Sequence, residues 1–215
     1  MNIGFISGTG NEGKALALRF GMNEHTILIG SRNIDKSNST VIEIKSILNE
    51  INIHGFNYQD TAKNADVIFL ALPYTVVENT VLDLKEELKG KLVIDTSVPM
   101  IFQEGKFTRD SNISTSISEN LSNILTDSMF VSSFHTISHT DLNKIDHELD
   151  HDLLYFVNEE NSESLFLKLI STVKGLNPIK CGTLDLSLLI ESQVPLLLNI
   201  NKNYKKSTSI KIKGL

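Results

Sequence analysis

The chain has little of what marks secreted, membrane-bound or nucleic-acid-binding proteins. Its 215 residues include one cysteine, Cys181, which excludes an intrachain disulfide and fits a reducing compartment. No apolar run approaches the ~20 residues that a membrane helix needs, and two residues before the first apolar run leave no room for a signal peptide. Asp and Glu (26) outnumber Lys and Arg (20), so no extended basic surface is expected. We therefore expect a soluble, cytoplasmic protein that binds neither membranes nor nucleic acid.

What the chain does have is short apolar runs that alternate with helical stripes. Apolar runs at 3–7, 26–30, 65–73, 92–95 and 129–134 are typical of buried parallel strands. Their alternation with helices predicts an α/β fold, a Rossmann-type doubly wound parallel sheet with a smaller C-terminal α/β domain. An acidic stretch from 141 to 163 suggests the boundary, which gives a dinucleotide-binding domain at 1–140 and a smaller domain at 141–215.

Three less regular segments carry their own expectations. Residues 101–127 are rich in Ser, Asn and Thr, so we expect a loop followed by an amphipathic helix. Residues 186–201 should form a long helix that Pro195 kinks or interrupts. The alternating tail at 209–215 predicts an edge strand.

The turn after the first strand carries a dinucleotide-binding fingerprint. It reads Gly8, Thr9, Gly10, Asn11, Glu12 and Gly13. Between a strand and a helix, Gly8 allows the tight turn, Gly10 lets the backbone approach a pyrophosphate, and Gly13 lets helix and strand pack closely. The alternative is a glycine-rich turn that binds nothing.

The end of the second strand indicates which dinucleotide is bound. An NAD site places Asp or Glu about 20 residues after the fingerprint. Here the chain has Ser31 and Arg32, with Lys36 one turn later, and no carboxylate. A hydroxyl, a guanidinium and an ammonium suit a 2'-phosphate, which favours NADP. Both cations could instead be ordinary surface residues.

Two further strand ends carry prolines. Leu72 and Pro73 follow one strand, and Val98 and Pro99 follow the next. In doubly wound sheets ligands bind outside the carboxyl ends of strands, so these aliphatic residues would form an apolar floor for a flat ring. Simple strand termination explains the prolines equally well.

Several histidines have a spacing or a position that suits metal binding or proton donation. The pairs His135 with His139 and His147 with His151 have H-x-x-x-H spacing, but neither comes with the carboxylate and third ligand of a zinc site, so no metal is expected. His135 at a strand end could give a proton during carbonyl or imine reduction. It could equally be a structural histidine that shapes a cleft.

Several motifs together make the chain resemble the NADPH-dependent coenzyme F420 reductases over nearly its whole length. The matching segments are Gly8 to Lys14, Ala17 to Arg19, Ile29 to Arg32, Leu72 to Tyr74, Val98 and Pro99, His135 to Ile137, Gly175 to Pro178, and Pro195 to Asn199. The resemblance implies direct hydride transfer between NADP(H) and the deazaflavin coenzyme F420, in a two-domain protein that usually forms a homodimer and holds the second cofactor between its domains.

The resemblance also implies roles for individual residues. The backbone of Thr9 to Glu12 would hold the pyrophosphate, and the 2'-phosphate would be bound by Thr9, Ser31, Arg32 and Lys36. The nicotinamide would lie between Leu72 and Val98, and the deazaflavin beside His135, Thr136 and Ile137. His139, where relatives usually carry a small residue, would contact NADP through its backbone. Acidic groups of F420 would suit the cationic C-terminal lysines, which are Lys202, Lys205, Lys206, Lys211 and Lys213.

Two other functions stay open at this point. One is an NADPH-dependent reductase of a flavin, ferric, carbonyl or imine substrate. The other is an NADP-binding sensor without turnover. The sequence does not indicate the physiological direction of hydride transfer.

Overall fold

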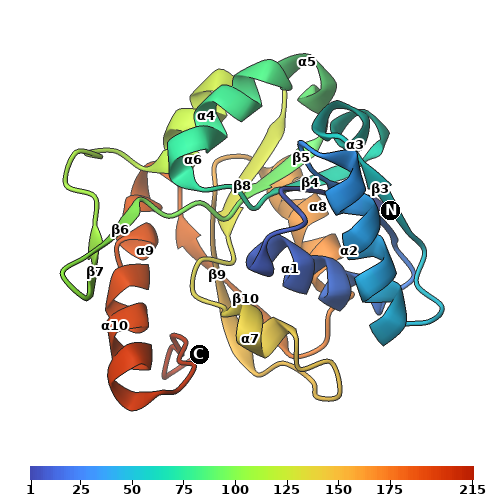
Figure 1. Ribbon diagram of the computed structural model, residues 1–215. Helices are drawn as coiled ribbons and strands as arrows, with labels where there is room; N and C mark the ends of the chain where they lie inside the picture. The colour runs from blue at the N-terminus through green and yellow to red at the C-terminus, as the bar shows by residue number, and fades with distance from the viewer.

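A single eight-stranded sheet forms the centre of the protein, in a computed structural model that describes residues 1–215 (Figure 1). The strand order is β10-β9-β8-β5-β4-β1-β2-β3, and every neighbouring pair is parallel except β8 with β9. The strands are β1 (Asn2–Ile6), β2 (Thr26–Gly30), β3 (Ile53–Phe56), β4 (Val67–Leu70), β5 (Leu92–Asp95), β8 (Met129–Ser133), β9 (His151–Val157) and β10 (Leu176–Gly182).

Helices connect these strands and cover the sheet. They are α1 (Asn11–Gly21), α2 (Ile34–Ile47), α3 (Tyr58–Asn64), α4 (Tyr74–Asp83), α5 (Lys85–Leu88), α6 (Ile117–Ile124), α7 (His139–Leu142), α8 (Glu160–Ile170), α9 (Leu188–Glu191) and α10 (Val194–Tyr204), with a 3-10 turn at Leu184–Leu186. The predicted doubly wound α/β sheet is therefore confirmed. None of these helices is long and apolar enough to cross a membrane.

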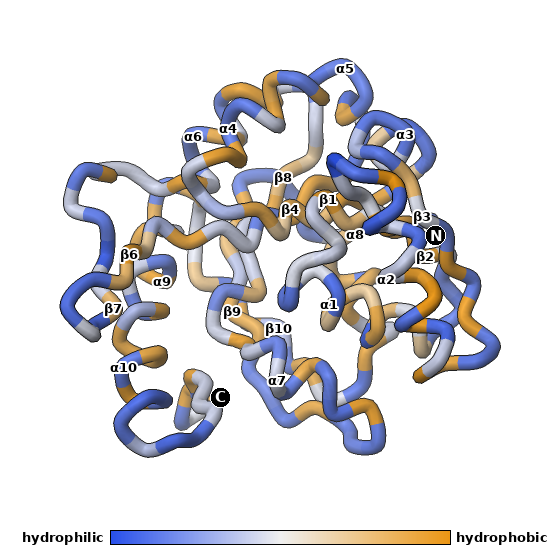
Figure 2. The backbone as a smooth tube through the Cα atoms, viewed as in Figure 1, coloured by the Kyte–Doolittle hydropathy of each residue, from blue (hydrophilic) through white to orange (hydrophobic).

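Two hydrophobic cores lie on the two faces of the sheet. Side chains alternate along β1, so Ile3 and Phe5 join the core that includes residues of α1 and α8, while Ile6 joins the core that includes residues of α3, α4 and α6. Phe69 is central to the first core, with its ring 5.0 Å from Phe5 and 5.2 Å from Phe20. Figure 2 shows these apolar strands passing through the middle of the molecule. Both faces of the sheet are thus buried, as near-continuous apolar strands predict.

The second half of the chain extends the same sheet. β9 runs antiparallel to β8 and parallel to β10, so the sheet has no break at residue 140. α9 and α10 then lie beyond it, next to a separate two-stranded hairpin (Figure 1). The division into domains at 1–140 and 141–215 stays a prediction.

Two expected segments turn out differently, and a third is interrupted at Pro195 as expected. The stretch at 101–127 begins with a hairpin, β6 (Met100–Gln103) and β7 (Lys106–Arg109), before helix α6. The helix expected at 186–201 is divided into the 3-10 turn, α9 and α10, because Pro195 occupies the first turn of α10, where its missing N–H costs nothing. The tail at 209–215 forms no strand.

Candidate active site

The glycine turn between β1 and α1 is built as a cradle for an anion. Gly8 N–H donates to the carbonyls of Phe5 and Gly30, both at 3.0 Å, which fixes the turn against two strands. The backbone N–H groups of Asn11, Glu12 and Gly13 make no hydrogen bond within the chain. Free N–H groups at a helix N-terminus carry partial positive charge, so this turn suits a diphosphate.

Two glycines of this turn differ in the space around them. A methyl group on Gly13 would lie 2.7 Å from the Ser7 carbonyl oxygen and 2.9 Å from Gly8 Cα, both backbone atoms. A methyl group on Gly10 would meet nothing closer than 3.4 Å. Gly13 therefore serves the packing of helix on strand, and Gly10 leaves room beside the backbone for a ligand.

The residues expected at the 2'-phosphate lie at the end of β2. Ser31 is buried, and its hydroxyl accepts the Asn33 N–H at 3.2 Å. The Asn33 side chain caps α2, accepting the N–H of Asp35 at 2.8 Å. Arg32 and Lys36 are exposed and form no ion pair. Two unpaired cations beside a helix N-terminus are a suitable site for a phosphate.

The residues expected at the nicotinamide lie at the ends of β4 and β5. Leu72 is buried and Val98 is half-buried, after strands that pair in parallel. The hydroxyl of Thr96 donates to the Leu70 carbonyl at 3.0 Å, which ties the two strand ends together. Pro73 is exposed and Pro99 is buried. The aliphatic side chains are therefore held at fixed positions on neighbouring strands.

The segment expected at the second ring follows β8. Phe134 has a left-handed backbone conformation with φ 68°, and His135, Thr136 and Ile137 after it are all buried. Neither ring nitrogen of His135 has a hydrogen-bond partner. Burial lowers the pKa of His135 to about 4, so its imidazole is neutral at ordinary pH. The His135 imidazole is therefore uncharged and shielded from solvent.

The strand order brings the predicted residues to one edge of the sheet. Strands β2, β1, β4, β5 and β8 are successive neighbours and all are parallel, so their carboxyl ends point the same way. The glycine turn, Ser31, Leu72, Val98 and His135 follow these five ends. One extended ligand, or two in contact, can therefore span them.

Helix α7 adds His139 to this edge. α7 packs against α1, and the His139 backbone N–H points at the Glu12 carboxyl group. His139 also lines a cavity of about 370 Å³ together with Asn11 and Lys14. His139 therefore lies beside the glycine turn, and its contact with the dinucleotide stays a prediction.

A buried arginine fixes α7 in this place. Arg19 on α1 donates from its guanidinium to the carbonyls of Leu142 at 3.0 Å, Lys144 at 2.8 Å and His147 at 3.1 Å. Its side chain is almost fully buried, and no carboxylate pairs with it. These bonds hold the C-terminal end of α7 and the loop after it against α1.

A second buried polar cluster lies between β5, α6 and α9, and sequence reasoning missed it. Glu191 on α9 accepts from the Ser116 hydroxyl at 2.6 Å and the Ile117 N–H at 3.2 Å, and Asp95 at the end of β5 accepts from the Ser118 hydroxyl at 2.7 Å. Burial raises the pKa of Glu191 to about 7 and also raises that of Asp95. The two carboxyl groups share the N-terminus of α6 and join it to β5 and α9.

The C-terminal lysines do not form one cationic group. Lys202 donates to the Gly105 carbonyl and lies 5.4 Å from the centre of the Phe102 ring. Lys211 pairs with Asp150. Lys205 and Lys206 are exposed without an ion pair. Lys213 is likewise exposed without an ion pair, so three of the five lysines are free to meet an acidic ligand.

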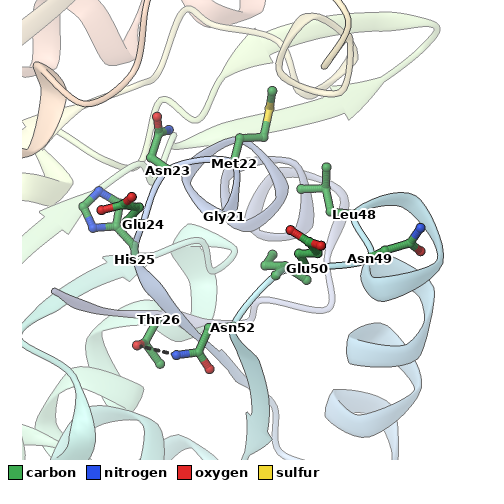
Figure 3. Close-up of a pocket in the computed structure, with 11 residues that line it drawn as sticks. Gly21, Met22, Asn23, Glu24, His25, Thr26, Leu48, Asn49, Glu50 and Asn52 are labelled. Atoms are coloured by element: carbon green, nitrogen blue, oxygen red, sulfur yellow. Dashed lines mark hydrogen bonds between the residues drawn. The ribbon is translucent and has the colours of Figure 1, made fainter.

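A cavity at the opposite edge of the sheet is not the candidate site. It measures about 590 Å³ and is lined by 21–26 and 48–52, around the amino ends of β2 and β3 (Figure 3). Ligands of doubly wound sheets bind outside the carboxyl ends instead. No group of three His, Cys, Asp or Glu side chains is placed to hold a metal ion.

Fold and site together define a Rossmann-type dinucleotide-binding protein. The family model described as "NADP oxidoreductase coenzyme F420-dependent" matches residues 2–99. The F420-dependent NADP reductase of Methanocaldococcus jannaschii is 37% identical, with 100% of this chain and 99% of that protein aligned. The enzyme of the same name from Methanothermobacter marburgensis is 30% identical, with the same coverage. The chain belongs to the family of F420-dependent NADP reductases.

Solved structures share the fold. An Arthrobacter sp. FB24 protein assigned to the F420-dependent NADP reductases superposes with a TM-score of 0.84 at 19% identity, covering 99% of both chains. A pyrroline carboxylate reductase of Plasmodium falciparum, solved with NADP bound, gives a TM-score of 0.62 at 15% identity and covers 95% of this chain and 66% of that one. At these identities the likeness concerns the fold alone.

Proposed function

We propose that this protein transfers a hydride directly between NADP(H) and coenzyme F420. The observation that carries the proposal is the full-length relationship to F420-dependent NADP reductases at 37% identity. The carboxyl edge of the sheet supports it, because the chain's anion cradle, apolar strand ends and buried histidine follow one another there. Those features suit one dinucleotide and a second flat ring.

The chain's own contribution is to bind and orient. Free N–H groups at the start of α1 would hold the diphosphate, and Ser31, Arg32 and Lys36 would hold the 2'-phosphate. Leu72, Pro73, Val98 and Pro99 would form the nicotinamide floor. His135, Thr136 and Ile137 would border the second ring. F420, when bound, would supply the deazaflavin carbon that exchanges the hydride. The protein would accelerate the transfer by holding the two rings close together and shielded from water.

The state of His135 favours this reaction over reduction of a carbonyl or imine. Such reductions need a proton donor in the transition state. A buried imidazole whose pKa is lowered to about 4 is neutral and a poor acid at pH 7. A neutral, unpartnered ring is instead suited to lie against a flat cofactor that needs no proton from it.

The deazaflavin absorbance provides the test. Purified protein is mixed with F420 and NADPH, or with reduced F420 and NADP, and the deazaflavin band is followed over time. Bleaching in the first mixture or recovery in the second is expected, with NADPH preferred over NADH. No change in either direction would refute the proposal, and tight NADPH binding without turnover would indicate a sensor.

We also propose a homodimer in the cytoplasm. Large apolar side chains are exposed on β6, α9 and α10, a set that we call the α10 face: Ile101, Phe102, Leu189, Leu196 and Tyr204. Figures 1 and 2 show these elements together at one side of the molecule, with apolar segments on both β6 and α10. Exposed apolar side chains of this size favour association with a second copy. The single cysteine fits a reducing compartment.

A further inference from the structure

Glu12 is an acidic residue inside the proposed diphosphate cradle. It is the second residue of α1, among the three whose N–H groups are free. The residue is half-buried, its Oε1 atom is shielded from solvent and has no hydrogen-bond partner, and the His139 backbone N–H points at the carboxyl group. An isolated carboxylate is costly to bury, so this group needs a compensating charge or a proton.

No neighbouring cation supplies that charge. On α1, Lys14 pairs with Glu43 at 2.7 Å, and Arg19 points at the carbonyls of the loop after α7. On α7, Asp141 is itself acidic and pairs with Lys144 at 2.6 Å, while the His139 ring lines the cavity beside Lys14. In the segment after β8, His135 is neutral.

Burial accordingly raises the pKa of Glu12 to about 8, and the His139 N–H compensates only in part. The N–H groups at the start of α1 can stabilise one anion well. A diphosphate and a Glu12 carboxylate would compete for them and repel each other across a low-dielectric space.

We propose that the dinucleotide binds with the Glu12 carboxyl group protonated, so that binding of NADP(H) takes up a proton at this residue. The protonated group is uncharged and has an O–H that can donate to a phosphate oxygen. This inference rests on the proposed dinucleotide site. It predicts that the affinity for NADP(H) falls at alkaline pH because Glu12 then loses its proton.

Isothermal titration calorimetry with NADP tests the inference without turnover. Titrations from pH 7 to 9.5, each in two buffers of different ionisation enthalpy, give both the affinity and the number of protons taken up. The 2'-phosphate does not interfere, because its second ionisation lies near pH 6. Wild-type protein should take up close to one proton near pH 9 and lose roughly 25-fold in affinity between pH 7.5 and 9.5.

Two variants locate the effect. Glu12→Gln keeps the shape of the side chain and cannot ionise, so its proton uptake should be near zero and its affinity flat over this range. Glu43→Gln removes a nearby carboxylate from an exposed ion pair and should behave as the wild type does. Glu12→Ala serves in place of Glu12→Gln if a thermal melt shows that Glu12→Gln is unfolded.

The outcomes separate this inference from the proposed function. Flat affinity in the wild type, or equal proton uptake in wild type and Glu12→Gln, would overturn it. If NADP binding takes up a proton but F420 is not turned over, the proposed reaction is refuted and the Glu12 inference is retained. Absence of NADP binding at every pH would overturn the inference together with the dinucleotide site.

Discussion

At the scale of single residues, Arg32 is proposed to distinguish NADPH from NADH. A charged hydrogen bond contributes about 1.5–3 kcal/mol, so Arg32→Glu should weaken NADPH binding by roughly 10- to 100-fold and change NADH binding much less. Lys45→Glu makes the same charge change in the last turn of α2, away from the strand end, and serves as the control. Dissociation constants from fluorescence titration provide the measurement. Equal losses for both nucleotides in Arg32→Glu would contradict the 2'-phosphate assignment.

The two glycines of the cradle should respond differently to a single methyl group. Gly13→Ala places Cβ against backbone atoms at 2.7 and 2.9 Å, so overpacking should lower stability by about 1–3 kcal/mol. Gly10→Ala meets no such contact and should keep the melting temperature while losing NADP affinity. Thermal melts and NADP titrations on both variants measure the difference. A Gly10→Ala variant that binds NADP as the wild type does would show that no ligand approaches there.

Glu191 should make the stability of the protein depend on pH. Its pKa rises from 4.5 to about 7 on folding, so between these values the folded state holds a proton that the unfolded state has lost. Stability should therefore fall as pH rises through this window, by about 3 kcal/mol in total, and then level off. Asp95 shifts in the same direction.

The test compares urea unfolding of wild type and Glu191→Gln at pH 5 and pH 8. Glutamine cannot ionise, so the variant should lose less stability between the two pH values. Its remaining pH dependence reports Asp95 and the other titrating groups. The same loss in both proteins would mean that Glu191 is ionised in the folded state throughout this range.

At the scale of elements, two side chains of α10 contact the β6–β7 hairpin, Lys202 at its turn and Asn199 on β7. Asn199 accepts the Phe107 N–H at 3.0 Å and donates to the Phe107 carbonyl at 2.7 Å. Asn199→Ala leaves both backbone groups without a partner, at a cost of about 1–3 kcal/mol. We expect faster hydrogen exchange at the Phe107 amide. Asn203→Ala, on the exposed side of the same helix, is the control and should leave that exchange unchanged.

The regular elements were predictable because their signals are local. Apolar runs, the glycine turn and the helical stripes were sufficient to place α1 and five strands of the sheet, β1, β2, β4, β5 and β8. The hairpin was missed because its turn, Glu104 and Gly105 at φ 51° and 76°, lacks the Asn-Gly pair that signals such turns. The tail alternates like a strand, but its Ile212 N–H donates to the Asp152 side chain at 2.7 Å, and it pairs with no strand.

The site was predictable to the extent that it follows the strand ends. Parallel strands bring Ser31, Leu72, Val98 and His135 to one edge, and that follows from chain order and fold class. The bonds between Glu191 and Ser116 or between Arg19 and Lys144 join residues 75 and 125 positions apart. Nothing in a single sequence pairs such distant polar residues, so these groups required the three-dimensional structure.

At the scale of the whole molecule, the α10 face should determine the oligomeric state. Phe102→Glu or Leu196→Glu would place a charge within an apolar interface, so either variant should shift a dimer toward monomer. Ile42→Glu on α2 changes an even more exposed apolar residue outside this face and should not. Light scattering coupled to size-exclusion chromatography measures the mass. A monomeric wild type would refute the homodimer proposal.

The same question can be approached through the one thiol of the chain. Cys181 is exposed on β10, the outermost strand of the sheet, and it is the only position that a maleimide dye can reach by thiol chemistry. Neighbouring side chains shield the sulfur in part and raise the pKa of this thiol, so labelling should be slow at neutral pH and faster near pH 8.5. A homodimer then carries exactly two dyes without any engineered site, and energy transfer between them reports the spacing of the two sheets as cofactors bind.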